Sequence, residues 1–147
     1  PAVRRAVSVH SEAGLVLSEI RQLLRQGLTP QQIAVIGAAA QEKGTLSNHR
    51  QVDGVPLISE AAEWRHGAGV LVTTARAFKG LESDVVIIYG LSSFGGLFTQ
   101  TDLYVAWTRA KHRLILVCQS GDVRALVETA LAQAERAVAT AEKSVVA

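Results

Sequence analysis

The 147-residue chain contains no methionine, a single cysteine and only 5% aromatic residues. Cys118 has no second cysteine to pair with, so an internal disulfide is excluded. Its position in the apolar run from Ile115 predicts a small buried side chain without a catalytic role. No apolar stretch approaches the roughly 20 residues of a membrane-spanning helix, and the apolar run after Arg4-Arg5 is too short for a signal peptide. These absences favour a soluble, cytoplasmic protein without a membrane partner.

The absence of methionine and the start at Pro1 lead us to expect a processed product or a piece cut from a longer protein. A hydrophobic fraction of 48% with 19% charged residues is typical of a globular protein, and the length suits one domain with a sizeable core. The formal net charge of +2 permits contact with nucleic acid without arguing for it. The four histidines show no metal-ligand spacing with Cys118, so we expect no metal site.

Apolar periodicity predicts strands that alternate with helices. The pattern indicates strands over residues 6–10, 33–36, 55–58, 70–74, 84–90 and 114–117, and helices over residues 11–26, 101–111 and 122–147. Ser11 is the expected cap of the first helix and Gly27 its stop, whereas Thr101 and Asp102 can cap the second. Pro56 marks the strand at 55–58 as an edge strand. The alternation indicates an α/β fold with three layers, in which a mostly parallel central sheet is flanked by helices. Strands 70–74 and 84–90 are expected neighbours.

Two segments about twenty residues apart place charged side chains beside these strands. The first runs from Thr73 to Glu82 between two apolar runs, and the second runs from Leu103 to Ala110 before the run that begins at Leu114. Ligand sites of α/β sheets lie at strand ends, so both segments are candidates for binding.

The first segment contains Phe78-Lys79-Gly80-Leu81-Glu82 and continues into Asp84-Val85-Val86-Ile87, and this string resembles motif V of the UvrD/Rep-like superfamily 1 DNA helicases. The second, Leu103-Tyr104-Val105-Ala106-Trp107-Thr108-Arg109-Ala110, resembles motif VI of the same family. Both motifs belong to the family's C-terminal, second RecA-like domain. The resemblance therefore implies a RecA-like domain over residues 1–120, with motif V at 73–82 and motif VI at 103–110, and a C-terminal helix or tail over residues 121–147.

The resemblance implies roles in a nucleotide site. Arg109 corresponds to the arginine finger that stabilises the γ-phosphate in the transition state. Glu82 would reach the ribose, Gly80 would allow a close approach, and Lys79 would stabilise phosphates. Each residue also has a simpler interpretation. In it, Arg109 is a surface arginine paired with a carboxylate, and Glu82 is a carboxylate in a turn. Gly80 is then a turn glycine without a ligand, and Lys79 binds a neighbouring carboxylate.

Motif V of this family also faces nucleic acid, and the matching positions are Thr73, Thr74 and Arg76. Many members have histidine where Arg76 stands, so a cation is retained but the usual hydrogen bonding is in doubt. A second departure follows the strand at 33–36, where the family often has an arginine and this chain has Gly37-Ala38-Ala39-Ala40. One phosphate contact is therefore either missing or supplied elsewhere.

The chain has no P-loop, because Lys43 precedes Gly44 in the one stretch with suitable residues. No acidic pair follows a strand in the manner of a Walker B magnesium site either. ATP with Mg²⁺ would thus be bound jointly with a missing N-terminal P-loop domain of the same polypeptide. The favoured hypothesis is the C-terminal motor domain of an ATP-dependent DNA helicase or translocase that contacts single-stranded DNA and is inactive as an ATPase alone. The alternative is a non-catalytic, helicase-like module that binds nucleic acid or a protein. A RecD-like motor of opposite polarity is a third possibility, against which Lys79-Gly80-Leu81-Glu82 argues.

Overall fold

The computed structural model describes residues 2–7, 12–37, 46, 48–91, 99–118 and 121–146, with the backbone alone for 2–7, 118, 121–127 and 142–146. Its strands are β1 (Ala2–Val7), β2 (Ile33–Gly37), β3 (Gln51–Val52), β4 (Val55–Ile58), β5 (Val70–Thr74), β6 (Ser83–Ile88) and β7 (Ala110–Cys118). Its helices are α1 (Glu12–Arg25), the 3₁₀ turn η1 (Pro30–Gln32), α2 (Ala61–Arg65), α3 (Ala75–Phe78), α4 (Gln100–Arg109) and α5 (Gly121–Val146). No helix within these ranges is both long enough and apolar enough to cross a membrane.

The sheet has the strand order β1-β7-β6-β2-β5-β4-β3, and all pairs are parallel except β3 with β4. The predicted α/β fold with a mostly parallel central sheet is therefore confirmed. The prediction that strands 70–74 and 84–90 are neighbours is wrong, since β2 lies between them and pairs with both. Residues Ile33 to Ile36 are completely buried, and a strand that is apolar on both faces belongs at the centre of a sheet.

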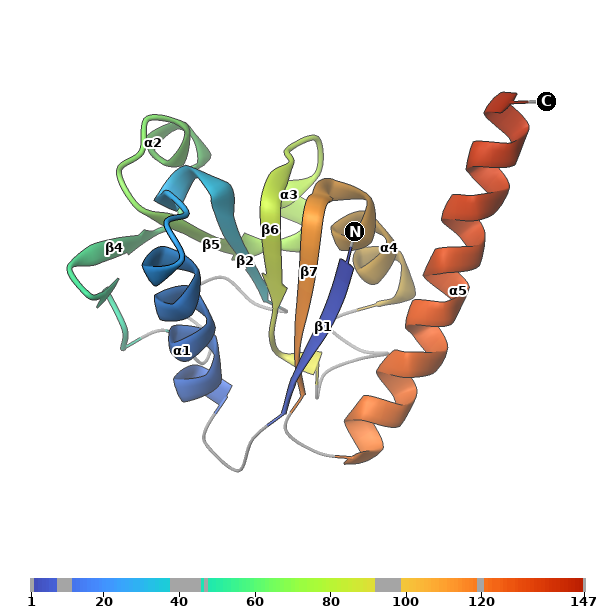
Figure 1. Cartoon of the computed structure of the whole chain (residues 1–147), viewed down its shortest axis with the longest axis horizontal. Coiled ribbons are helices and arrows are strands. Elements are labelled where there is room, and N and C mark those ends of the chain that lie inside the picture. Colours follow the sequence, from blue (N-terminus) through green and yellow to red (C-terminus); the bar gives the residue numbers. More distant parts are fainter. Residues whose placement is uncertain are drawn as a thin grey trace.

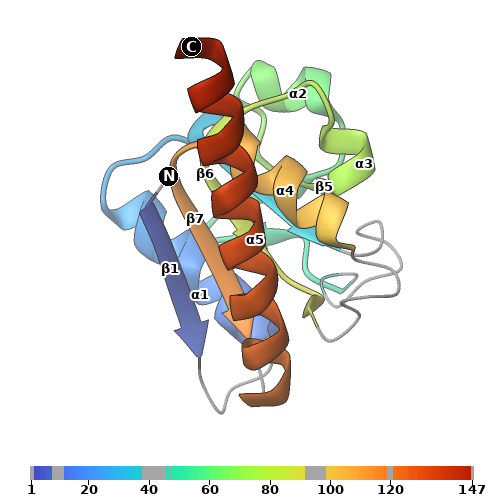
Figure 2. The same cartoon turned by 90° about the vertical axis from the view of Figure 1, so that its right-hand side faces the viewer.

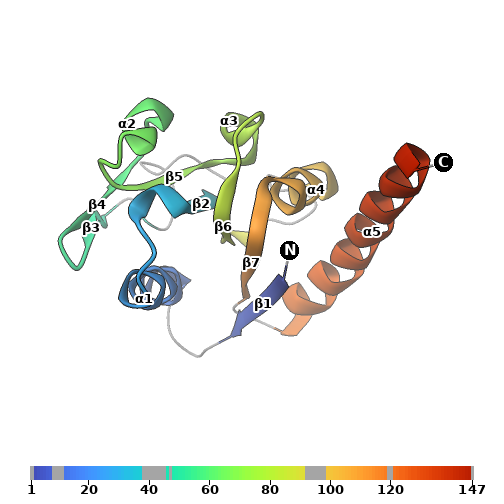
Figure 3. The same cartoon turned by 45° about the horizontal axis from the view of Figure 1, so that its top comes forward.

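Helices cover both faces of the sheet and form two separate cores (Figure 1, Figure 3). Ala34 and Ile36 of β2 point to the core beneath α2, α3, α4 and α5, whereas Ile33 and Val35 point to the core beneath α1. This alternation follows from the two-residue period of a strand. Helix α5 lies beside β7 and β1 at one end of the sheet (Figure 2). Because helices cover both faces, the two ends of the strands, which we call the amino edge and the carboxyl edge of the sheet, are the places left for ligands.

The predicted strand at residues 55–58 exists, but it is not the outermost strand, because β3 pairs with it in an antiparallel hairpin. Asp53 (φ 49°) and Gly54 (φ 82°) form the two-residue turn, and both have the positive φ that this hairpin type requires. The Asp-Gly pair was the sequence signal for this hairpin. At the N-terminus, β1 begins at Ala2 rather than Ala6, and residues 8–11 of the predicted strand and cap lie outside the described residues.

Candidate functional site

The first half of the Thr73–Glu82 segment is held by β5 and the short helix α3. Thr73 is 9% exposed within β5, and Thr74 caps α3 because its Oγ1 accepts a hydrogen bond from the backbone N–H of Ala77 at 3.2 Å. Phe78 is completely buried, and its ring centroid lies 6.1 Å from that of Trp64. Because these residues anchor α3, Arg76 is held on the exposed side of the helix.

A turn after α3 redirects the chain into β6. Lys79 is the exposed C-cap of α3, and Gly80 has φ +88°, which a residue with a side chain adopts only with strain. The backbone N–H of Leu81 then donates to the carbonyl of Phe78 at 3.0 Å. Glu82 is exposed directly before the first residue of β6. The turn therefore separates Lys79 from Glu82.

Helix α4 carries most of the second segment. Its N-cap is Thr99, whose hydroxyl accepts from the backbone N–H of Asp102 at 3.2 Å, while the Asp102 carboxylate accepts from the backbone N–H of Thr99 at 2.8 Å. The prediction of a cap at Thr101 and Asp102 is therefore wrong, since Asp102 is the third helical residue and closes a capping box. Leu103, Ala106 and Trp107 pack into the core and fix the orientation of the helix.

Arg109 is the last residue of α4, and Ala110 already belongs to β7. The strand thus starts before the predicted Leu114, without a connecting loop. Arg109 is half-buried, and its Nε atom is buried without a hydrogen-bond partner among the atoms that the structure describes. An orphaned donor of this kind costs free energy unless another molecule satisfies it.

Glu82 and Arg109 lie at the same edge of the sheet. Each directly precedes one member of the register pair Ser83 and Ala110, which join β6 to β7. This is the edge where both strands begin, at the top of Figure 1, and not the carboxyl edge that usually holds ligands in such sheets. Thr74, in contrast, ends β5 at the carboxyl edge. The predicted site residues are therefore divided between two edges.

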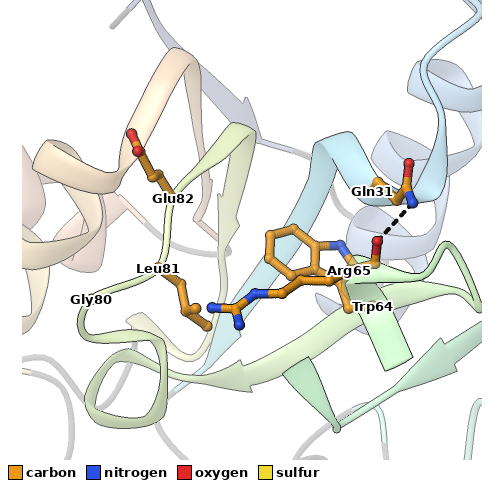
Figure 4. A pocket seen from close by; sticks show the side chains of 6 residues that line it. All are labelled: Gln31, Trp64, Arg65, Gly80, Leu81 and Glu82. Atoms are coloured by element: carbon orange, nitrogen blue, oxygen red, sulfur yellow. Dashed lines mark hydrogen bonds between the residues drawn. The ribbon is translucent and has the colours of Figure 1, made fainter. Parts of the chain in front are cut away.

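A pocket of about 490 Å³ lies beside Glu82. We call it the α2–β6 pocket, and its lining residues are Gln31, Trp64, Arg65, Gly80, Leu81 and Glu82. The guanidinium of Arg65 extends toward Leu81, while the carboxylate of Glu82 points away from this guanidinium (Figure 4). The Trp64 indole N–H donates to the carbonyls of Pro30 at 2.9 Å and Ile33 at 3.1 Å, which fixes α2 against β2.

Sequence reasoning missed Arg65 because α2 is only five residues long and has no apolar period that would have marked it. The backbone carbonyl of Arg65 accepts from the Gln31 side chain at 2.8 Å, so η1 and α2 are joined on one side of the α2–β6 pocket (Figure 4). Tertiary contacts of this kind leave no local signal in the sequence.

A second pocket, of about 500 Å³, lies between α3 and the start of α4. We call it the α3–α4 pocket, and it is lined by Ala75, Arg76, Lys79, Thr99, Thr101, Asp102 and Val105. Lys79 therefore lines the same pocket as Arg76, whereas Gly80 and Glu82 line the other. The structure does not bring the three predicted cofactor-binding residues together.

No group of histidine, cysteine, aspartate and glutamate side chains in the described part of the chain could hold a metal ion. The Asp84 carboxylate at the amino edge accepts from the Gln32 side-chain amide at 2.8 Å and lies 3.9 Å from Nε2 of His112. Cys118 and the stretch from Ala38 to Thr45, which contains Lys43 and Gly44, lie outside the described side chains.

These observations define a class of protein, a three-layer α/β domain with two pockets beside a mostly parallel sheet. The sequence profile of a family described as an AAA domain matches residues 2–121, so the chain belongs to this AAA-domain family. AAA-type domains in general use nucleotides. Among curated proteins, no match was found.

A solved structure shares the fold. The crystal structure of the C-terminal domain of a possible DNA helicase from Lactobacillus plantarum WCFS1 superposes with a TM-score of 0.60 at 24% sequence identity. The alignment covers 81% of this chain and 73% of that chain. At this identity the likeness establishes the arrangement of strands and helices.

Proposed function

We propose that this chain is the C-terminal motor domain of an ATP-dependent DNA helicase or translocase of the UvrD/Rep-like type. In this proposal residues 1–120 form the RecA-like unit and residues 121–147 a C-terminal helix. The domain completes an ATP site whose P-loop lies on an N-terminal domain of the same polypeptide. The AAA-domain family and the fold of the helicase domain from Lactobacillus plantarum support it.

The observation that carries the proposal is the position of Arg109 beside Glu82. Both precede paired residues of adjacent strands, which lie about 5 Å apart in a sheet. The Arg109 guanidinium forms no ion pair with a described residue, and its Nε is shielded from water. A cation in such a position interacts strongly with an anion that approaches it, because the local dielectric is low.

Arg109 would act as the arginine finger. Packing of α4 against the core holds the guanidinium in place before the neighbouring domain closes, so little reorganisation is needed when charge develops on the γ-phosphate. Glu82 would accept hydrogen bonds from the ribose hydroxyls, and Gly80 would let the backbone approach. MgATP, bound mainly by the P-loop domain, supplies the phosphoryl group. Arg65, exposed on the α2–β6 pocket beside the start of β2, is a further cation that lines the same pocket as Glu82.

The proposed DNA-facing group is at the other edge. Arg76 is exposed and free to contact a phosphate, and Thr74 can donate its hydroxyl proton while it caps α3. Thr73 is nearly buried, so it would contribute mainly by positioning the end of β5.

The test is Arg109→Ala in the polypeptide that contains this domain and its P-loop partner. We expect ATP binding to remain and DNA-stimulated turnover to fall by on the order of a thousandfold. Arg25→Ala, which removes an exposed arginine at the end of α1, is the matched control and should retain full activity. Unchanged turnover by Arg109→Ala would refute the finger assignment.

Two further observations separate the motor from a non-catalytic, helicase-like binding module. A P-loop encoded upstream in the same reading frame would support the motor. The isolated 147-residue chain should show no ATP hydrolysis, and robust hydrolysis by the purified chain would refute the shared site.

A further inference from the structure

We propose that the α3–α4 pocket binds a phosphodiester group of single-stranded nucleic acid, with Arg76 and Lys79 as the cations and the Thr101 hydroxyl as a hydrogen-bond donor. This inference rests on the proposed function. It moves Lys79 from the nucleotide site to the DNA site and adds Thr101, which neither the sequence motifs nor the comparisons assign.

The charges of the residues that line the α3–α4 pocket favour an anion. Arg76 and Lys79 are three residues apart, a spacing that places side chains on one side of a helical turn, and both line this pocket. Both are exposed, and neither forms an ion pair with a described residue. Two like charges held together without a counterion attract an anion, and a phosphate diester carries one negative charge per nucleotide.

Among the described lining residues, the single carboxylate is that of Asp102, and it is already engaged in capping α4. Oδ2 of Asp102 accepts from the backbone N–H of Thr99 at 2.8 Å and from its hydroxyl at 3.1 Å. Asp102 thus caps the helix, and the three charged lining residues, Arg76, Lys79 and Asp102, together leave the pocket with a net positive charge.

Thr101 supplies the hydroxyl on the opposite wall. It is exposed in the first turn of α4, and no hydrogen bond of its side chain occurs within the described part of the structure. The hydroxyl of Thr99 differs, because it is engaged with Asp102. A hydroxyl and two cations facing one space match the acceptor oxygens of a phosphate. The volume of about 500 Å³ is enough for the phosphate and its sugar.

The backbone explains why Lys79 and Glu82 serve different ligands. Gly80, with φ +88°, turns the chain so that the residue before it lines the α3–α4 pocket and the residues after it line the α2–β6 pocket. Lys79 is therefore directed to the side of Arg76.

The experiment measures binding of a fluorescent oligothymidylate to the protein across a salt series. Lys79→Gln should weaken binding about threefold to tenfold and lower the magnitude of the slope of log K against log salt by about 0.7, the value for one lost phosphate contact on a single strand. Thr101→Val should weaken binding about fivefold with the slope unchanged, because it removes a hydrogen bond and no charge. Arg25→Gln, an exposed cation at the end of α1, should bind like the unaltered protein.

A normal salt slope for Lys79→Gln, or normal affinity for Thr101→Val, would overturn the pocket assignment. So would a Lys79→Gln variant whose KM for ATP rises in the two-domain polypeptide while its DNA affinity is unchanged. Lys79→Glu, which reverses the charge, should weaken binding further than Lys79→Gln, and thermal melts verify that each variant is folded. Absence of binding by the unaltered protein would instead contradict the proposed function, so the two failures are distinguishable.

Discussion

Tyr89 offers a sharp test of the structure, because its hydroxyl is buried without a hydrogen-bond partner among the described residues. The side chain is 2% exposed and follows β6, where its backbone N–H donates to the carbonyl of Ile36 at 3.0 Å. Tyr89→Phe removes the orphaned hydroxyl and keeps the ring. Since an unsatisfied buried polar group costs about 1–3 kcal/mol, we expect the variant to be about 1 kcal/mol more stable at neutral pH.

The difference should grow in alkali. Burial, together with the negative charge of Glu12, raises the pKa of Tyr89 from 10.0 to about 12. Between these values the phenol of the unfolded chain loses its proton while that of the folded chain keeps it. The unfolded state then binds fewer protons, so stability falls as pH rises, by about 1.4 kcal/mol per pH unit. Across the whole interval the loss is about 3 kcal/mol, and Tyr89→Phe should not show it.

Urea unfolding monitored by circular dichroism at pH 7, 9 and 11 would measure both effects. Tyr104→Phe, which removes the second of the two tyrosines, is the control, and ultraviolet difference spectra of that variant report tyrosinate formation at Tyr89 alone. Lower stability of Tyr89→Phe at pH 7 would refute the orphaned hydroxyl. A fall in stability between pH 9 and 11 equal to that of the unaltered protein would refute the linkage to Tyr89.

Two further substitutions test packing beside the proposed sites, each by urea unfolding. Gly37→Ala would place a Cβ 2.4 Å from Cζ of Tyr89, so the ring must move. We expect the free energy of unfolding to fall by about 2 kcal/mol. A loss below about 0.5 kcal/mol, as for a typical surface substitution, would contradict this geometry. Trp64→Phe keeps an aromatic ring but deletes the N–H that donates to the carbonyls of Pro30 and Ile33. We expect the free energy of unfolding to fall by about 1–2 kcal/mol. Unchanged stability would show that this donor does not anchor α2.

The sequence predicted the elements that have strong local signals. The strand at residues 70–74 was predicted with the observed bounds, and β2 extends the predicted 33–36 by one residue, because both are continuous apolar runs with polar or glycine limits. Helix α1 shows the expected buried stripe, which includes Val16, Ile20 and Leu23, and the chain leaves it through Gly27 at φ +96°.

The errors arose where distant residues decide the structure. Insertion of β2 between β5 and β6 depends on which strands pair across the sheet, and this long-range pairing leaves no local signal in the sequence. Thr99 rather than Thr101 caps α4, because a capping box needs an acidic residue at the third helical position, and Asp102 stands there relative to Thr99. The site residues were identified as two motifs, but their division between two pockets depends on the turn at Gly80 and on the course of α4.

That division has a mechanical consequence for the proposed motor. Helix α4 has Thr101 in its first turn and Arg109 as its last residue, so the proposed DNA contact and the proposed finger are about 12 Å apart along the helix axis. Leu103 and Ala106 are completely buried, which prevents the helix from sliding over the sheet without breaking close packing. A force on the α3–α4 pocket would therefore reach the amino edge by movement of the whole domain. We infer that ATP binding and DNA binding are coupled through closure of this domain onto its P-loop partner. The domain would move as one rigid body, with one ligand at each end of α4.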